Sequence, residues 1–151
     1  MKNPILKTLL LFSFFMFFTP GLLSAQEVIG KIFTKTEADQ MFGPVLKKFD
    51  IDVNAVKALL DQAGDYIMFN YDTDDLYVVN GKKKVIFNYG QMKNSFPTEI
   101  FRKFSVSVVR DLLSRGNEDK VHVEKRTDVI TVTYSSLTMD FSQACPPYCE
   151  Y

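Results

Sequence analysis

Cysteine and histidine, which supply most transition-metal ligands and many catalytic groups, are scarce in this sequence. Its 151 residues include two cysteines, Cys145 and Cys149, and one histidine, His122. A structural zinc site usually takes four ligands, so this set is too small for one. His122 alternates with Val121 and Val123. That alternation predicts a surface histidine on the solvated face of a strand, with no catalytic or ligand role.

Recognisable catalytic and cation-binding motifs are also missing. The sequence has no G-x-S-x-G elbow, H-E-x-x-H helix, C-x-x-C-H haem signature or phosphate-binding glycine loop. Asp72 and Asp74 resemble the start of an EF-hand loop, but Leu76, Tyr77 and Lys83 occupy its fifth, sixth and twelfth positions. The acidic run therefore predicts a turn. We expect no catalytic residue, no metal site and no cofactor.

An excess of one charge and a long apolar run are absent as well. Eighteen basic and eighteen acidic residues give a formal net charge of zero. The one basic run, residues 82–84, is much weaker than the basic stripe that nucleic-acid binding requires. The longest apolar run, residues 8–18, is well short of the roughly 20 residues that a membrane-spanning helix needs. We expect neither nucleic-acid binding nor a stable membrane span.

The amino-terminal segment has the layout of a secretory signal peptide. Lys2 and Lys7 precede the apolar run, and the small-residue stretch Leu23-Ser24-Ala25 follows it. This pattern predicts a removed signal peptide over residues 1–25 and an exported protein, periplasmic or secreted. Residues 26–151 are then long enough for a single domain with its own core.

Three helices are expected in that domain. The first begins near Thr36 and ends at Gly43, which precedes a proline. The second is capped by Asp52 and ended by Gly64, and we expect it to pack against the first. The third spans about residues 107–115, where apolar residues recur at helical spacing after a serine cap.

Six strands are expected around these helices. Three antiparallel strands lie between residues 66 and 89, with turns at Asp72–Asp75 and Asn80-Gly81, and the first is predicted to be central. Three more follow the third helix, and their alternation predicts one buried and one solvated face. The element order is then roughly ααβββαβββ. It predicts an α+β fold with one antiparallel sheet of about five to six strands and two to three helices on one face.

The two cysteines lie close together at the carboxyl end. In an oxidising compartment Cys145 and Cys149 are expected to form a local disulfide, provided that the chain turns at Pro146-Pro147. Three alternatives stay open: a thiolate pair for copper or zinc, with Met139 or His122 nearby; a redox pair; and bonding to another chain.

These observations favour an exported, non-catalytic binding or structural domain of the cell envelope, whose partner is a protein or a small molecule that the sequence does not identify. One alternative is an envelope metal-handling protein that uses the C-x-x-x-C pair for copper or zinc. Another is an enzyme whose site forms only in the fold. Five tyrosines are candidates to line a ligand pocket between helices and sheet: Tyr66, Tyr71, Tyr77, Tyr89 and Tyr134.

Export and the disulfide can be tested together by the intact mass of the protein from its exported fraction, measured with and without reduction and thiol alkylation. We expect a chain that begins at Gln26 and is two hydrogens lighter than its reduced form, because Cys145 and Cys149 are paired. Free thiols would contradict the disulfide, and a retained Met1 would contradict cleavage.

Overall fold

A computed structural model of the protein describes residues 27–72, 75–90 and 100–145. The predicted signal peptide, Asp74 and Cys149 lie outside these residues. The described chain contains three helices and ten strands: β1 (Lys31–Thr34), α2 (Lys35–Phe42), β2 (Lys47–Asp52), α3 (Val53–Ala63), β3 (Tyr66–Asp72), β4 (Asp75–Asn80), β5 (Val85–Tyr89), β6 (Phe101–Ser105), α4 (Val106–Ser114), β7 (Lys120–Lys125), β8 (Ile130–Tyr134), β9 (Leu137–Asp140) and β10 (Gln143–Cys145). The predicted α+β class is confirmed.

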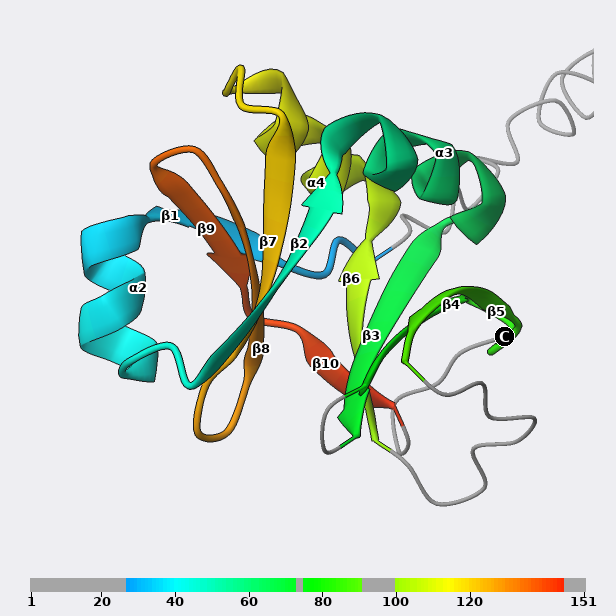
Figure 1. Ribbon diagram of the computed structural model, residues 1–151, viewed down its shortest axis with the longest axis horizontal. Helices are drawn as coiled ribbons and strands as arrows, with labels where there is room; N and C mark the ends of the chain where they lie inside the picture. Colours follow the sequence, from blue (N-terminus) through cyan, green and yellow to red (C-terminus); the bar gives the residue numbers. More distant parts are fainter. Residues whose placement is uncertain (1–26, 73–74, 91–99, 146–151) are drawn as a thin grey trace, which may run out of the picture.

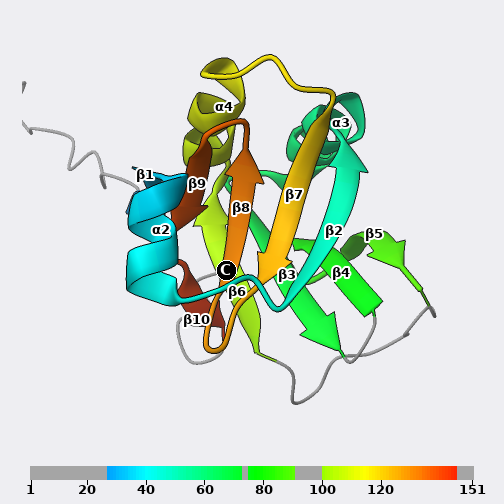
Figure 2. The ribbon, with the colours of Figure 1, turned by 60° about the vertical axis from the view of Figure 1, so that its left-hand side comes forward.

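The strands form two antiparallel sheets of five strands each, so the expectation of a single sheet was wrong. Sheet 1 has the order β1-β9-β8-β7-β2, and sheet 2 has the order β10-β6-β3-β4-β5. Figure 2 shows sheet 1 in front of sheet 2. The pattern missed four strands, β1, β2, β6 and β10, and three of them are edge strands. The predicted central strand, β3, does lie between β4 and β6.

Helices α3 and α4 lie together at one end of the two sheets (Figures 1 and 2). As predicted, α3 is capped by Asp52, whose Oδ1 accepts hydrogen bonds from the Asn54 and Ala55 amides, and it ends at Gly64. Helix α4 begins at Val106, one residue earlier than expected, because Phe101–Ser105 pairs with β3 as strand β6.

Helix α2 lies apart from the other two, on the side of sheet 1 that faces away from sheet 2 (Figures 1 and 2). It contacts β1 and β9, and it is separated from α3 by strand β2. The predicted packing of the first two helices on each other was therefore wrong. Its cap is Thr34 rather than Thr36: the Thr34 hydroxyl accepts from the Glu37 amide, and the Glu37 carboxylate accepts from the Thr34 amide.

The main apolar core fills the space between the two sheets and beneath α3 and α4. Its members include Val121 and Val123 of β7, Ile67 and Phe69 of β3, and Leu112 of α4. Apolar side chains removed from water contribute about 25 cal/mol per Å² of buried surface, so this core is the main driving force for folding. A smaller apolar cluster lies on the far face of sheet 2.

The outer face of sheet 1 was predicted to be solvated, yet much of it is buried. Glu124 and Arg126 have relative exposures of 2% and 1%. The Glu124 Oε2 atom accepts hydrogen bonds from Arg126 Nη2 at 3.1 Å and from the hydroxyls of Thr131 and Thr133 at 3.1 and 2.9 Å. Arg126 Nη1 donates to Asp39 of α2 at 2.8 Å. An alternating pattern cannot reveal that a helix covers the polar face.

We expect Arg126→Met to lower the free energy of unfolding by about 3 kcal/mol, because it leaves the Glu124 carboxylate buried without its counter-charge. Urea unfolding followed by circular dichroism would measure this. The matched control is Arg115→Met, which removes an exposed ion pair with Asp111 and should cost less than about 1 kcal/mol. Equal losses of unfolding free energy in the two variants would show that the buried ion pair stabilises the fold no more than the exposed one.

Candidate functional site

His122 projects from the outer face of sheet 1, as predicted, but it is not a lone surface histidine. Its Nδ1 lies 2.8 Å from Oδ1 of Asp50 on the neighbouring strand β2, and its side chain is 21% exposed. Burial tends to raise the pKa of Asp50. The hydrogen bond and charge of His122, together with Lys48, outweigh burial and hold that pKa below its ordinary value. The pair links two strands.

The residues proposed for a metal site do not come together. Cys145 is buried in the apolar cluster on the far face of sheet 2. Met139 faces the main core, and His122 lies on the opposite side of sheet 1. Among the described residues there is no group of three or more histidine, cysteine, aspartate or glutamate side chains placed to hold a metal ion. Cys149 is outside those residues, so the disulfide stays a prediction.

The five candidate tyrosines are spread over the molecule. Tyr77 and Tyr134 are buried, with relative exposures of 0% and 3%, whereas Tyr89 is 59% exposed. Tyr66 stacks beneath the Lys103 ammonium, whose Nζ is 4.7 Å from the ring centre. Tyr71 lies in a pocket that it shares with the polar side chains of Arg102 and Lys125, described below.

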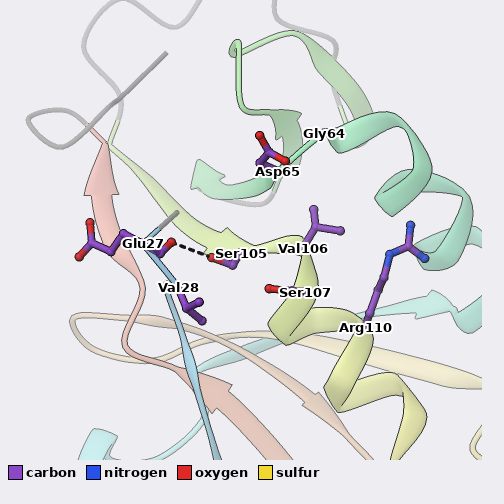
Figure 3. Close-up of a pocket in the computed structure, with 8 residues that line it drawn as sticks. All are labelled: Glu27, Val28, Gly64, Asp65, Ser105, Val106, Ser107 and Arg110. Carbon is purple, nitrogen blue, oxygen red and sulfur yellow. Dashed lines mark hydrogen bonds between the residues drawn. The ribbon is translucent and has the colours of Figure 1, made fainter. Parts of the chain in front are cut away.

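One pocket lies beside the start of α4, where it meets the turn after α3 and the start of the described chain (Figure 3). It has a volume of about 330 Å³, and two of its polar side chains, Ser105 and Arg110, already have partners. The Ser105 hydroxyl accepts from the Ile29 amide at 2.8 Å and is 3.5 Å from the Glu27 carbonyl oxygen. Arg110 reaches toward α3, where it pairs with Asp61 at 2.7 Å. The Ser105 contacts fasten residues 27–29 to the end of β6, and the Arg110–Asp61 pair joins α4 to α3.

A second pocket, the mouth pocket, lies at the end of the inter-sheet space opposite α3 and α4. Its volume is about 290 Å³. It is lined by Tyr71 of β3, by Ile100 and Arg102 at the start of β6, and by residues 125–130 of the β7–β8 hairpin. The two sheets therefore supply opposite walls.

Three polar side chains enter the mouth pocket from core-facing positions. Lys125 is opposite the core residue Ile130 and two places beyond Val123, so it projects from the core face of sheet 1. Arg102 is opposite the core residue Phe69 and two places before Phe104 on sheet 2. Tyr71 is two places beyond Phe69.

Asn70 also lines this pocket, but its side chain lies on the other face of sheet 2, where it is opposite Tyr77. Its Nδ2 donates to the Ile100 carbonyl at 2.8 Å. Its Oδ1 is the one buried side-chain polar atom of the described residues that has no hydrogen-bond partner. Because this oxygen belongs to the far face, we do not assign it to the pocket.

Two hydrogen bonds join the walls of the mouth pocket. The Tyr71 hydroxyl donates to the Val123 carbonyl of sheet 1, and Arg102 Nη2 donates to the Asp128 carbonyl in the β7–β8 hairpin. Burial, together with the negative charge of Glu124, raises the pKa of Tyr71, so its hydroxyl stays a donor at neutral pH. The pocket walls are thus held in place without a ligand.

The charge of the mouth pocket is unbalanced. The Arg126 guanidinium is neutralised on the outer face by Glu124 and Asp39. Asp140 lies near Arg102: burial raises the pKa of Asp140, and hydrogen bonds from Ser142 and the Arg102 charge only partly oppose this. Asp140 is not among the residues that line the pocket, and Arg102 and Lys125 are the positive side chains of the lining that form no ion pair with a described carboxylate.

Sequence reasoning missed both Arg102 and Lys125. A usable signal was present at Lys125, which continues the apolar alternation of Val121 and Val123 and so occupies a core-facing position at the strand's end. A long cationic side chain at such a position predicts the rim of a core. No such signal identifies Arg102, because the sequence of residues 100–105 fits a helix as well as a strand.

Comparison with known proteins identified no family for this chain. No protein-family model matches it, and no curated protein or solved structure is significantly similar to it. Within the described residues, no helix combines the length and the apolar character needed to cross a membrane.

Tyr71→Phe should lower the free energy of unfolding by about 1 kcal/mol, because the Val123 carbonyl loses the hydrogen bond that joins the sheets. Urea unfolding of the purified variant would measure the loss. Tyr66→Phe is the matched control, since the Tyr66 hydroxyl makes an exposed 3.3 Å contact with the Glu27 carbonyl. A Tyr71→Phe protein no less stable than this control would contradict a structural role for the bridge.

Proposed function

We propose that this protein is an exported, non-catalytic binding domain that takes a small molecule in the mouth pocket. Export is supported by the signal-peptide pattern of residues 1–25. The observation that carries the binding proposal is the convergence of Tyr71, Arg102 and Lys125, from the core faces of two different sheets, on one pocket.

The architecture supports binding at this place. Ligand sites are concave and usually preformed, with a few polar groups set into apolar walls. The mouth pocket has an apolar wall from Ile130 and Tyr71, a volume near the lower end of the usual 300–1,000 Å³ range, and walls joined by two hydrogen bonds. A preformed pocket loses little conformational entropy when it binds.

The non-catalytic part of the proposal is supported by the side chains near the pocket. Nucleophilic catalysis needs a nucleophile within hydrogen-bond reach of a base. In the described structure the Asp50–His122 pair lies on the outer face of sheet 1, and Cys145 lies on the far face of sheet 2. Thr127 is the one hydroxyl-bearing aliphatic residue of the pocket lining, and no histidine lines the pocket with it.

Binding can be tested by titrating ¹⁵N-labelled protein, residues 26–151, with a small-molecule library of acids, amines, sugars and nucleosides. We expect at least one ligand to shift the backbone amide signals of Tyr71, Arg102 and residues 125–130 and to be recovered unchanged. Shifts confined to the pocket around Ser105, or none at all, would contradict the mouth pocket as the site. Conversion of the ligand to a product would contradict a non-catalytic domain.

A further inference from the structure

Arg102 differs from the other three arginines of the described residues, which all form ion pairs with carboxylates, although Asp140 lies near it. Arg110 pairs with Asp61, Arg115 with Asp111, and Lys48 with Asp50, while Arg126 pairs with both Glu124 and Asp39. Arg102 is bonded instead to a main-chain carbonyl, that of Asp128. For Lys125 no ion pair exists with any described residue. Both side chains are only partly exposed.

The two positive groups face one pocket from opposite walls, which is unfavourable without a counter-charge. Like charges that line one partly desolvated pocket disfavour each other, and an anion bound in the pocket offsets this cost. The acidic residue of the pocket lining, Asp128, is exposed and offers its main-chain carbonyl to Arg102. The lining therefore has a net positive charge that a ligand can complement.

The donors suit an oxyanion. A guanidinium has five N–H donors in a planar fork, and the bond from Arg102 Nη2 to Asp128 leaves donors on the other nitrogens. A lysine ammonium adds three more donors on a flexible stem. Charge-assisted hydrogen bonds to carboxylate or phosphate oxygens are about twice as strong as neutral ones.

The remaining wall is apolar and the pocket is small. Ile130 belongs to the main core, and the Tyr71 ring packs against Phe49 with centroids 5.2 Å apart. A volume of about 290 Å³ suits a small molecule rather than a polymer. One charged end and one flat or apolar end would match the pocket.

We propose that the mouth pocket binds a small organic anion, whose carboxylate or phosphate oxygens lie between Arg102 and Lys125 and whose apolar part lies against Tyr71 and Ile130. This inference rests on the proposed function, because it names the class of ligand for the same pocket.

The test compares four probes in ¹H–¹⁵N titrations of residues 26–151: benzoate, benzamide, phenyl phosphate and inorganic phosphate. Benzoate and benzamide have nearly the same shape and differ in charge. We expect benzoate and phenyl phosphate to shift the amide signals of Arg102 and residues 125–130, with benzamide at least tenfold weaker. Inorganic phosphate, which lacks the apolar part, should also be weaker than phenyl phosphate. The preferred head group, carboxylate or phosphate, follows from the comparison of the two aromatic anions.

Three variants locate the charge effect. Arg102→Gln and Lys125→Gln should each weaken benzoate binding about tenfold, which is the loss expected for one charge-assisted hydrogen bond. Lys120→Gln removes a charge from the opposite end of the same strand and should leave binding unchanged. If a pocket variant fails to fold, the comparison of benzoate with benzamide on the unaltered protein still decides the question.

The outcomes separate this inference from the proposed function. Benzamide that binds at the mouth pocket as tightly as benzoate would overturn the anionic class and leave the pocket as a binding site. If Lys120→Gln weakens benzoate binding as much as Arg102→Gln and Lys125→Gln do, the overall charge of the protein, and not the pocket, attracts the anion. If neither the library nor the four probes shift the amide signals of the mouth-pocket residues, both proposals are overturned.

Discussion

A guanidinium taken out of water must have its donors satisfied, and the arrangement around Arg126 meets that requirement. Arg126 is 1% exposed and bonds to Glu124, to Thr131 and to Asp39 and the Gly43 carbonyl at the end of α2. Breaking such a set is costly, because any group left alone stays buried and charged. These bonds attach α2 to sheet 1 together with the buried Ala38 and the Phe42 ring, which packs against Phe33 and Phe141.

The same residue connects the outer face to the mouth pocket. Arg126 directly follows β7, and the hairpin it begins forms one wall of the pocket. Its side chain points outward to Glu124 and α2, while the preceding residue, Lys125, projects into the pocket. Because successive side chains project from opposite faces, Arg126 lies beside its carboxylate partners and Lys125 does not. The first stabilises the fold, and the second is available to a ligand.

The two ends of the inter-sheet core are closed in different ways. At one end, α3 and α4 cover the core with apolar residues such as Leu60 and Leu112. At the other end, Tyr71 and Arg102 join the sheets by hydrogen bonds to main-chain carbonyls. Polar bridges between strand ends leave a hollow that apolar side chains on a helix would fill. The difference explains why the pocket with convergent polar groups lies away from the helices.

Local features of the sequence determined the α+β class, the cap of α3 at Asp52, the end of α2 at Gly43 and the hairpin at Asn80, because caps and turns depend on residues a few places apart. Only the tertiary structure decided that the strands divide into two sheets, that α2 covers the polar face of sheet 1, and that Arg102 and Lys125 line one pocket. Those outcomes depend on which distant strands pair and on what covers each face. Alternation along a single strand shows that its two faces differ in polarity, but it contains no information about the element that packs on either one.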